Sequence, residues 1–119
     1  MKFIDSKMHG IIDYLYVIFL LAAPALFNLS DFTASYAYVL AGLAFVVTIL
    51  TDFEVGIFKV IPFPIHGIID LFMGILLVIS PWLFNFAVYE TDRNLFLVLG
   101  FVVLLVFTFT RFRQPIEQT

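Results

Sequence analysis

Four long apolar stretches constrain this chain more than any other feature: residues 10–27, 34–51, 67–86 and 95–110. Each is close to the roughly 17–25 residues that a helix needs to cross a hydrocarbon core. None alternates with a period of two, as the strands of a membrane barrel would, and helices are the other structure that pairs every backbone group in lipid. The sequence therefore predicts an all-α membrane protein, with four transmembrane helices in one domain over residues 1–119.

The composition places the chain in lipid. Hydrophobic residues make up 63% of it and charged residues only 13%, against about 25% charged in a typical soluble domain. A small soluble domain leaves much of its surface in water and could not hide so much apolar area. The net charge of −3 and the absence of Cys exclude a basic surface for nucleic acid, disulfides and thiolate metal sites. We expect the lipid bilayer to be the main partner.

The orientation follows from the basic residues, which concentrate on the cytoplasmic side of membrane proteins. Only Arg93 falls between the third and fourth stretches. The other five lie before the first, between the second and third, or after the fourth: Lys2, Lys7, Lys59, Arg111 and Arg113. This distribution predicts that both termini are cytoplasmic.

The pentapeptide HGIID occurs at residues 9–13 and again at 66–70. At this spacing of 57 residues, thirteen of the 27 positions from residue 2 to residue 28 are identical. The second and fourth stretches match more loosely, through TDF at 51–53 and TRF at 110–112, after a further shift of two residues. We infer two tandem helical-hairpin repeats, about 2–53 and 59–112. Because two helices separate the copies, they are parallel repeats, related by an axis along the membrane normal.

The two copies close on APALFN at residues 23–28 and SPWLFN at 80–85. The second resembles the signature of the SPW repeat family of small bacterial membrane proteins. The first copy departs from it, with Ala23 and Ala25 where the second has Ser80 and Trp82. The resemblance implies four helices and a location in the bacterial inner membrane, and it implies no particular activity.

Each HGIID segment carries a histidine and a carboxylate four residues apart: His9 with Asp13, and His66 with Asp70. Such positions share one face of a helix. If the repeats pack about their axis, the two pairs face each other, and two imidazoles with two carboxylates suit zinc or a related divalent ion. Ionisable residues inside a membrane helix are costly and by default indicate function. These four residues are the candidate metal site.

A structural interpretation of the same residues stays open. The predicted spans begin at residues 10 and 67, so Asp13 and Asp70 fall in first turns, where the helix dipole and unpaired N–H groups stabilise a carboxylate. The histidines would then lie at headgroup depth, and each Asp would hold a His of the other repeat or a backbone donor. Binding of a lipid head group is a third interpretation.

Other residues have simpler expected roles. We expect Lys2 and Lys59 to reach lipid phosphate and Trp82 to lie in the aromatic belt at the membrane interface. Small residues let membrane helices approach closely. Five glycines are therefore expected to be close-packing points: Gly10, Gly42, Gly67, Gly74 and Gly100.

The sequence carries no enzyme motif that we recognise. It has no glycine-rich phosphate loop and no nucleophile elbow, and a His/Asp pair without a nucleophile is a weak basis for catalysis. We predict a non-enzymatic inner-membrane protein, a scaffold or accessory subunit that self-associates or binds a partner membrane protein. The alternative is a module that binds, transports or senses a divalent metal ion or protons through the paired His-x-x-x-Asp motifs. No cofactor other than such a metal ion is predicted.

Overall fold

The computed structural model describes residues 2–112, which form four α-helices and two short strands. Each helix is long and apolar enough to cross a membrane, which confirms the predicted all-α fold with four membrane-spanning helices. Arg113, one of the five basic residues behind the predicted topology, lies outside the described residues. The elements are α1 (Ser6–Leu26), α2 (Asp31–Leu50), β1 (Thr51–Asp52), β2 (Ile61–Pro62), α3 (Phe63–Leu83) and α4 (Glu90–Phe109).

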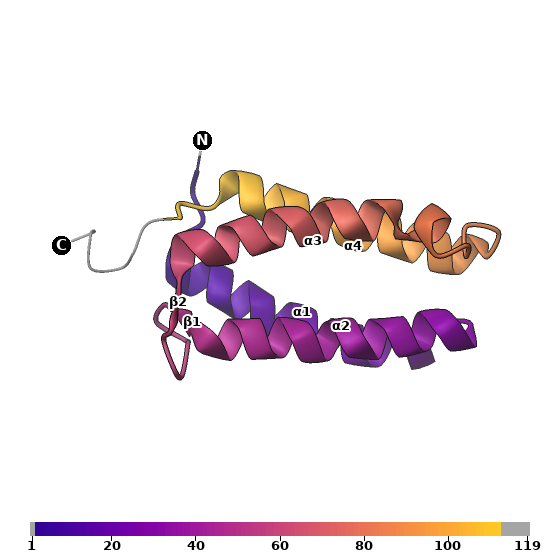
Figure 1. Ribbon diagram of the computed structural model, residues 1–119, viewed down its shortest axis with the longest axis horizontal. Coiled ribbons are helices and arrows are strands. Elements are labelled where there is room, and N and C mark those ends of the chain that lie inside the picture. The colour runs from indigo at the N-terminus through magenta and orange to yellow at the C-terminus, as the bar shows by residue number, and fades with distance from the viewer. Residues whose placement is uncertain (1, 113–119) are drawn as a thin grey trace.

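The helices form two hairpins. α1 packs along α2, and α3 packs along α4, while the contacts between hairpins are sparser. Figure 1 shows the hairpins as two layers, with α1 and α3 both starting at the end of the bundle that holds β1 and β2. The two HGIID segments therefore lie at the same end. Which side of the membrane that end faces stays a prediction.

The helices α1 and α3 begin four residues earlier than the sequence indicated. α1 begins at Ser6 because the carboxylate of Asp5 caps it, accepting the Met8 N–H at 2.8 Å. α3 begins at Phe63, with a proline in its first turn where the missing N–H costs nothing.

Asp13 and Asp70 are consequently the eighth residues of their helices, and neither helix has an acidic residue in its first turn. The expectation that the helix dipole and free N–H groups stabilise these two carboxylates is wrong, because those effects fade beyond the first turn. His9 and His66 are buried inside the protein and are not half exposed as that interpretation expected.

Short backbone pairings join the two hairpins at this end. Thr51, at the end of α2, pairs with Ile61 in the parallel β1–β2 ladder. Thr110, at the end of α4, forms an equivalent bridge with Ile4, which leads into α1. Each hairpin therefore ends beside the segment that begins the other, and this brings each threonine next to the opposite HGIID segment.

The glycines differ in what surrounds them. A Cβ at Gly100 would lie 2.9 Å from the carbonyl oxygen of Gly74, so α3 and α4 meet here almost backbone to backbone. A Cβ at Gly67 would lie 2.8 Å from the ring of Phe112. Nothing lies within 4 Å of a Cβ at Gly42, which is exposed on the outer face of α2. Close packing is confirmed for Gly100, Gly74, Gly67 and Gly10, where a Cβ would collide with Val55, and is wrong for Gly42.

The half of the bundle away from β1 and β2 is filled by an apolar core. Its buried members come from all four helices and both short loops. Asp92, 4% exposed, also ties the hairpins together there, since its Oδ2 accepts from the backbone N–H and the hydroxyl of Ser30 at 3.1 and 2.7 Å. The core residues are Val17, Leu20, Ala23, Leu29, Ala37, Leu40, Ala41, Leu77, Phe86, Leu95, Phe96 and Leu99.

Candidate metal centre

The structure brings His9, Asp13, His66 and Asp70 together between the hairpins. His9 Nε2 lies 2.9 Å from Asp70 Oδ2 and 3.3 Å from Asp13 Oδ2. His66 Nε2 lies 3.0 Å from Asp13 Oδ2 and 3.3 Å from Asp70 Oδ2. The shorter separation of each histidine is to the carboxylate of the other repeat. One ligand atom from each of the four residues lies within 4.8 Å of the others.

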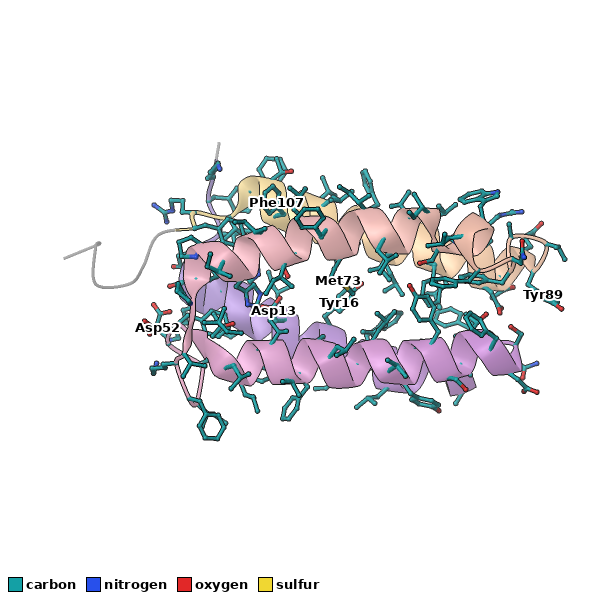
Figure 2. The ribbon with its side chains drawn as sticks, in the orientation of Figure 1. Asp13, Tyr16, Asp52, Met73, Tyr89 and Phe107 are labelled. Carbon is teal, nitrogen blue, oxygen red and sulfur yellow. The ribbon has the colours of Figure 1, made fainter. Side chains whose placement is uncertain are left out.

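The histidines and the carboxylates differ in exposure. His9 and His66 are 0% and 2% exposed, whereas the side chains of Asp13 and Asp70 are 18% and 19% exposed. The imidazoles thus lie inside the protein and the carboxylates at the edge of an internal space. Figure 2 shows Asp13 pointing into the space between the two hairpins.

Two threonines fix the orientation of the imidazoles. Thr51 Oγ1 donates its only proton to the carbonyl oxygen of Val47 at 2.6 Å, so at 2.7 Å it accepts the Nδ1–H of His66. Thr110 Oγ1 likewise accepts the Nδ1–H of His9 at 2.9 Å, because it donates its own proton to the carbonyl oxygen of Val106 at 2.5 Å. Histidines that bind metals commonly donate their second N–H in this way.

The Nε2 atoms of both histidines consequently face the carboxylates. A neutral imidazole that keeps its proton on Nδ1 presents a lone pair at Nε2, which an ionised carboxylate repels. The arrangement therefore needs positive charge between the groups, supplied either by protons or by a metal ion. Although 3.0 Å apart, His66 Nε2 and Asp13 Oδ2 are both buried and form no hydrogen bond among residues 2–112.

The spacing of the four groups fits a small divalent ion. Zinc bonded at 2.0–2.1 Å in tetrahedral geometry holds its ligands about 3.3 Å apart. The four imidazole–carboxylate separations are 2.9–3.3 Å and all four ligand atoms lie within 4.8 Å of one another, so the four groups are close enough to bind one small ion once the side chains adjust. Two carboxylates also neutralise its charge, which matters where the surroundings are apolar.

Aromatic rings close the histidine end of the centre. Phe63 and Phe112 each lie edge-on to His9 with centroids 5.4 Å apart, and Phe53 lies 5.7 Å from His66. Phe53 and Phe63 are fully buried. The glycine of HGIID allows this closure, because a Cβ at Gly67 would collide with Phe112 and one at Gly10 with Val55 and Phe53.

A cavity of about 280 Å³ adjoins the carboxylates on the other side. All four helices line it, and its walls are aliphatic except for Asp13, Tyr16, Thr48, His66 and Asp70. Figure 2 shows Tyr16 and Met73 pointing into this space from opposite hairpins. Towards the far end of the bundle the cavity stops at Leu20, Leu40 and Leu77 of the apolar core.

The SPW repeat domain matches residues 7–112 of this chain. The chain belongs to the SPW repeat family. It is accordingly a small membrane protein, as the resemblance of residues 80–85 indicated. Comparison with curated proteins and with solved structures found no match.

The Ser-Pro-Trp tripeptide of this SPW protein lies at the end of α3, far from the four-residue cluster. Ser80 and Pro81 are buried and Trp82 is 58% exposed. Ser80 Oγ donates to the carbonyl oxygen of Leu76 at 2.6 Å and accepts from Tyr36 Oη, also at 2.6 Å. The motif thus joins α3 to α2 through a hydroxyl pair that the first repeat, with buried Ala23, does not have.

The three residues expected at the membrane interface lie outside the cluster. Lys2 and Lys59 are exposed near the end of the bundle that holds β1 and β2. The ammonium of Lys59 donates to the carbonyl oxygen of Phe53 at 2.6 Å, which steadies the loop between β1 and β2. Trp82 is exposed at the opposite end. Their contacts with lipid stay a prediction.

Thr51 and Thr110 are the site residues that the sequence analysis did not identify. The signal for them was present, because both open the tripeptides, TDF and TRF, that match between the second and fourth helices. Their role could not be predicted because each threonine lies at the end of one hairpin and contacts the histidine of the other. Thr51 accepts from His66 of the second repeat, and Thr110 accepts from His9 of the first.

Proposed function

We propose that this protein is a non-enzymatic metal-binding protein of the bacterial inner membrane, which holds one divalent ion at His9, Asp13, His66 and Asp70. The observation that carries the proposal is the pair of threonine-oriented imidazoles, whose Nε2 atoms lie 2.9–3.3 Å from two carboxylates. The excess of Lys and Arg near the end holding β1 and β2 supports placing that end, and with it both termini, in the cytoplasm.

The ligand set favours zinc, manganese or cobalt. Imidazole suits borderline transition metals, and carboxylate also suits manganese. Magnesium and calcium prefer shells made of oxygen alone, and Cu(I) prefers sulfur ligands. Two of the four protein ligands are nitrogen and two are oxygen, so we expect tight binding of zinc and weaker binding of manganese.

The surroundings favour storing or sensing the ion over transporting it. Phe53, Phe63 and Phe112 cover the centre on one side, and the cavity on the other side stops at apolar leucines. A transported ion needs polar groups along its path. Leu20, Leu40 and Leu77 lie between the cavity and the next polar groups of the described chain, the Tyr36–Ser80 hydroxyl pair and Asp92 with Ser30, which bond to each other and not to the cavity. We therefore propose an accessory or scaffold role that depends on the bound ion, with self-association or a partner membrane protein as its output.

A second candidate uses the same residues without metal. With both imidazoles protonated, His9 pairs with Asp70 at 2.9 Å and His66 with Asp13 at 3.0 Å, and each pair joins one repeat to the other. The cluster would then be a structural lock between the hairpins. This candidate is favoured by the shorter separations, which are the ones between repeats.

Titration calorimetry in lipid nanodiscs distinguishes the candidates. We expect saturable binding of one zinc ion per chain to the wild type, and at least about tenfold weaker binding to His9→Ala and His66→Ala, with similar losses because the repeats are equivalent. Asp31→Asn, an exposed carboxylate on α2 outside the cluster, is the matched control and should bind normally. A wild type without saturable binding would leave only the structural lock.

A further inference from the structure

The cavity beside the metal centre has the size of a small-molecule site. Its volume is about 280 Å³, just below the roughly 300 Å³ at which small-molecule pockets begin. The part of its lining beyond the carboxylates runs from Asp13 to Leu20 on α1 and from Asp70 to Leu77 on α3, which is about 10 Å at 1.5 Å per residue. A molecule with one six-membered ring and a short substituent fits these dimensions.

Apart from His66, whose Nε2 faces Asp13 Oδ2 at 3.0 Å, the polar groups of the cavity accept hydrogen bonds but have no free proton to donate. Tyr16 donates its hydroxyl proton to the carbonyl oxygen of Leu99 at 3.3 Å, and Thr48 donates to the carbonyl oxygen four residues earlier at 2.6 Å. Asp13 and Asp70 turn their Oδ2 atoms to the imidazoles. Among residues 2–112 no group donates to their Oδ1 atoms, although both side chains are partly exposed where they line the cavity.

The walls of the cavity continue into the surface that faces lipid. Leu43 of α2 and Val102 of α4 line the cavity and are 55% and 38% exposed at the middle of their membrane-spanning helices. The histidine end is covered by Phe53, Phe63 and Phe112. A molecule therefore reaches the cavity from within the bilayer.

We propose that this cavity binds a small, neutral, membrane-soluble phenol or alcohol, whose hydroxyl donates to the carboxylates of Asp13 and Asp70. Its apolar body packs on the aliphatic walls, which stay dry and take up apolar molecules. The ligand is neutral because two protons or one divalent ion already balance the two carboxylates. The proposal does not depend on which of these is present, since both leave the carboxylate face on the cavity available.

A matched pair of probes tests whether the ligand must carry a hydroxyl group that donates a hydrogen bond. The fluorine NMR signals of para-trifluoromethylphenol and of its methyl ether, para-trifluoromethylanisole, are followed in nanodiscs with and without the protein, and the empty discs correct for partitioning into lipid. Both probes fit the cavity, but only the phenol can donate. We expect saturable binding of the phenol with a Kd at least about tenfold below that of the ether, because a hydrogen bond to a charged group is lost.

Substitutions that fill the cavity test whether the phenol binds there. Ala44→Phe places a ring among the lining residues, and Val46→Phe places the same ring on the exposed face of α2. Ala44→Phe should weaken phenol binding at least about tenfold, and Val46→Phe should not. If Ala44→Phe does not give a monodisperse protein, Ala44→Leu replaces it. Absence of saturable phenol binding, equal affinity for phenol and ether, or no effect of filling the cavity would each overturn the proposal.

Zinc binding to the metal centre is measured separately on the same samples. Ala44→Phe leaves all four candidate ligands in place, so zinc titration of this variant reports the centre alone. Loss of phenol binding with zinc binding intact is the expected result for this variant. A wild type that binds phenol but not zinc would refute the metal centre and leave the cavity proposal standing.

Discussion

Thr110 Oγ1 lies 2.9 Å from Nδ1 of His9, although 101 residues separate them in the chain. Thr51 stands in the same relation to His66 at 2.7 Å. Both hydroxyls also donate to the backbone of their own helix. Each imidazole is therefore held by the residue that directly follows a helix, α2 or α4, which begins at the far end of the bundle. The geometry of the cluster thus depends on how the two hairpins meet.

Removing either hydroxyl should weaken metal binding without removing a ligand. Thr51→Val and Thr110→Val keep the side-chain shape but leave the Nδ1–H of one histidine without an acceptor, so the ring is free to turn and its Nε2 is less basic. Loss of such a supporting group typically costs about 10–100-fold in metal affinity. We expect this loss for each variant, measured by zinc titration in nanodiscs.

Thr108 supplies the control for this experiment. It makes the same bond to the carbonyl oxygen four residues earlier, at 2.8 Å, but it is exposed and away from the cluster. Thr108→Val should bind zinc as the wild type does, and Thr51→Ser, which keeps the hydroxyl, should restore most of the lost affinity. Equal losses in Thr108→Val and Thr110→Val would mean that the threonines act on the helix and not on the histidines.

Protons should compete with metal at this cluster. Metal binding requires imidazole lone pairs, so ions and protons exclude each other at Nε2 of His9 and His66. Zinc affinity should thus fall steadily as the pH is lowered from about 8 to about 5.5, because protons take up the imidazole lone pairs that the ion needs. Calorimetry in two buffers of different ionisation enthalpy measures the protons released per zinc ion. If the zinc affinity does not change between pH 5.5 and 8, the ion does not bind through the histidines.

The sequence predicted the architecture because apolar length and the internal repeat are properties of the chain itself. Thirteen identities at a spacing of 57 residues and four apolar stretches were sufficient for the helices and for the candidate ligands. It did not predict the starts of α1 and α3. Asp5, Pro62 and Pro64 lie outside the predicted spans, yet Asp5 caps α1 and the two prolines lie at the start of α3.

The roles of residues that depend on a neighbour far along the chain were also hidden. Gly42 and Gly100 look alike in sequence, but one faces outward and the other meets a neighbouring helix. A threonine at the end of an apolar run looks like a boundary residue until the segment beside it is known. Such roles arise from the crossed pairing of the two hairpins, which neither periodicity nor composition encodes.

Gly100 and Gly42 test the close packing of α3 on α4. A methyl group at Gly100 would lie 2.6 Å from Val78 and 2.9 Å from the backbone of Gly74, so the helices must move apart. Gly100→Ala should destabilise the protein by about 1–3 kcal/mol, the range for overpacked cores. Gly42→Ala meets no atom and should be neutral or stabilising by up to about 1 kcal/mol.

Thermal unfolding in one detergent, followed by circular dichroism, compares the two glycine variants. The expected order of stability is Gly42→Ala, wild type, then Gly100→Ala. If Gly100→Ala were as stable as the wild type, the close approach of α3 and α4 at Gly74 would be refuted.

The hydroxyl pair of the Ser-Pro-Trp motif should contribute modestly to stability. Ser80 Oγ donates to Leu76, so Tyr36 must donate to Ser80 across the hairpins. Ser80→Ala and Tyr36→Phe should each cost about 1 kcal/mol, since hydrogen bonds between membrane helices average about 0.6 and reach about 1.7 kcal/mol.

A double-mutant cycle isolates this bond from the loss of either group. The double variant should be less destabilised than the sum of the singles, because the second substitution removes a partner that is already unpaired. Ser35→Ala, an exposed serine on α2, is the control and should leave stability unchanged. Strictly additive losses would show that the two hydroxyls do not interact, and the second repeat would then need another reason to carry serine where the first has the buried Ala23.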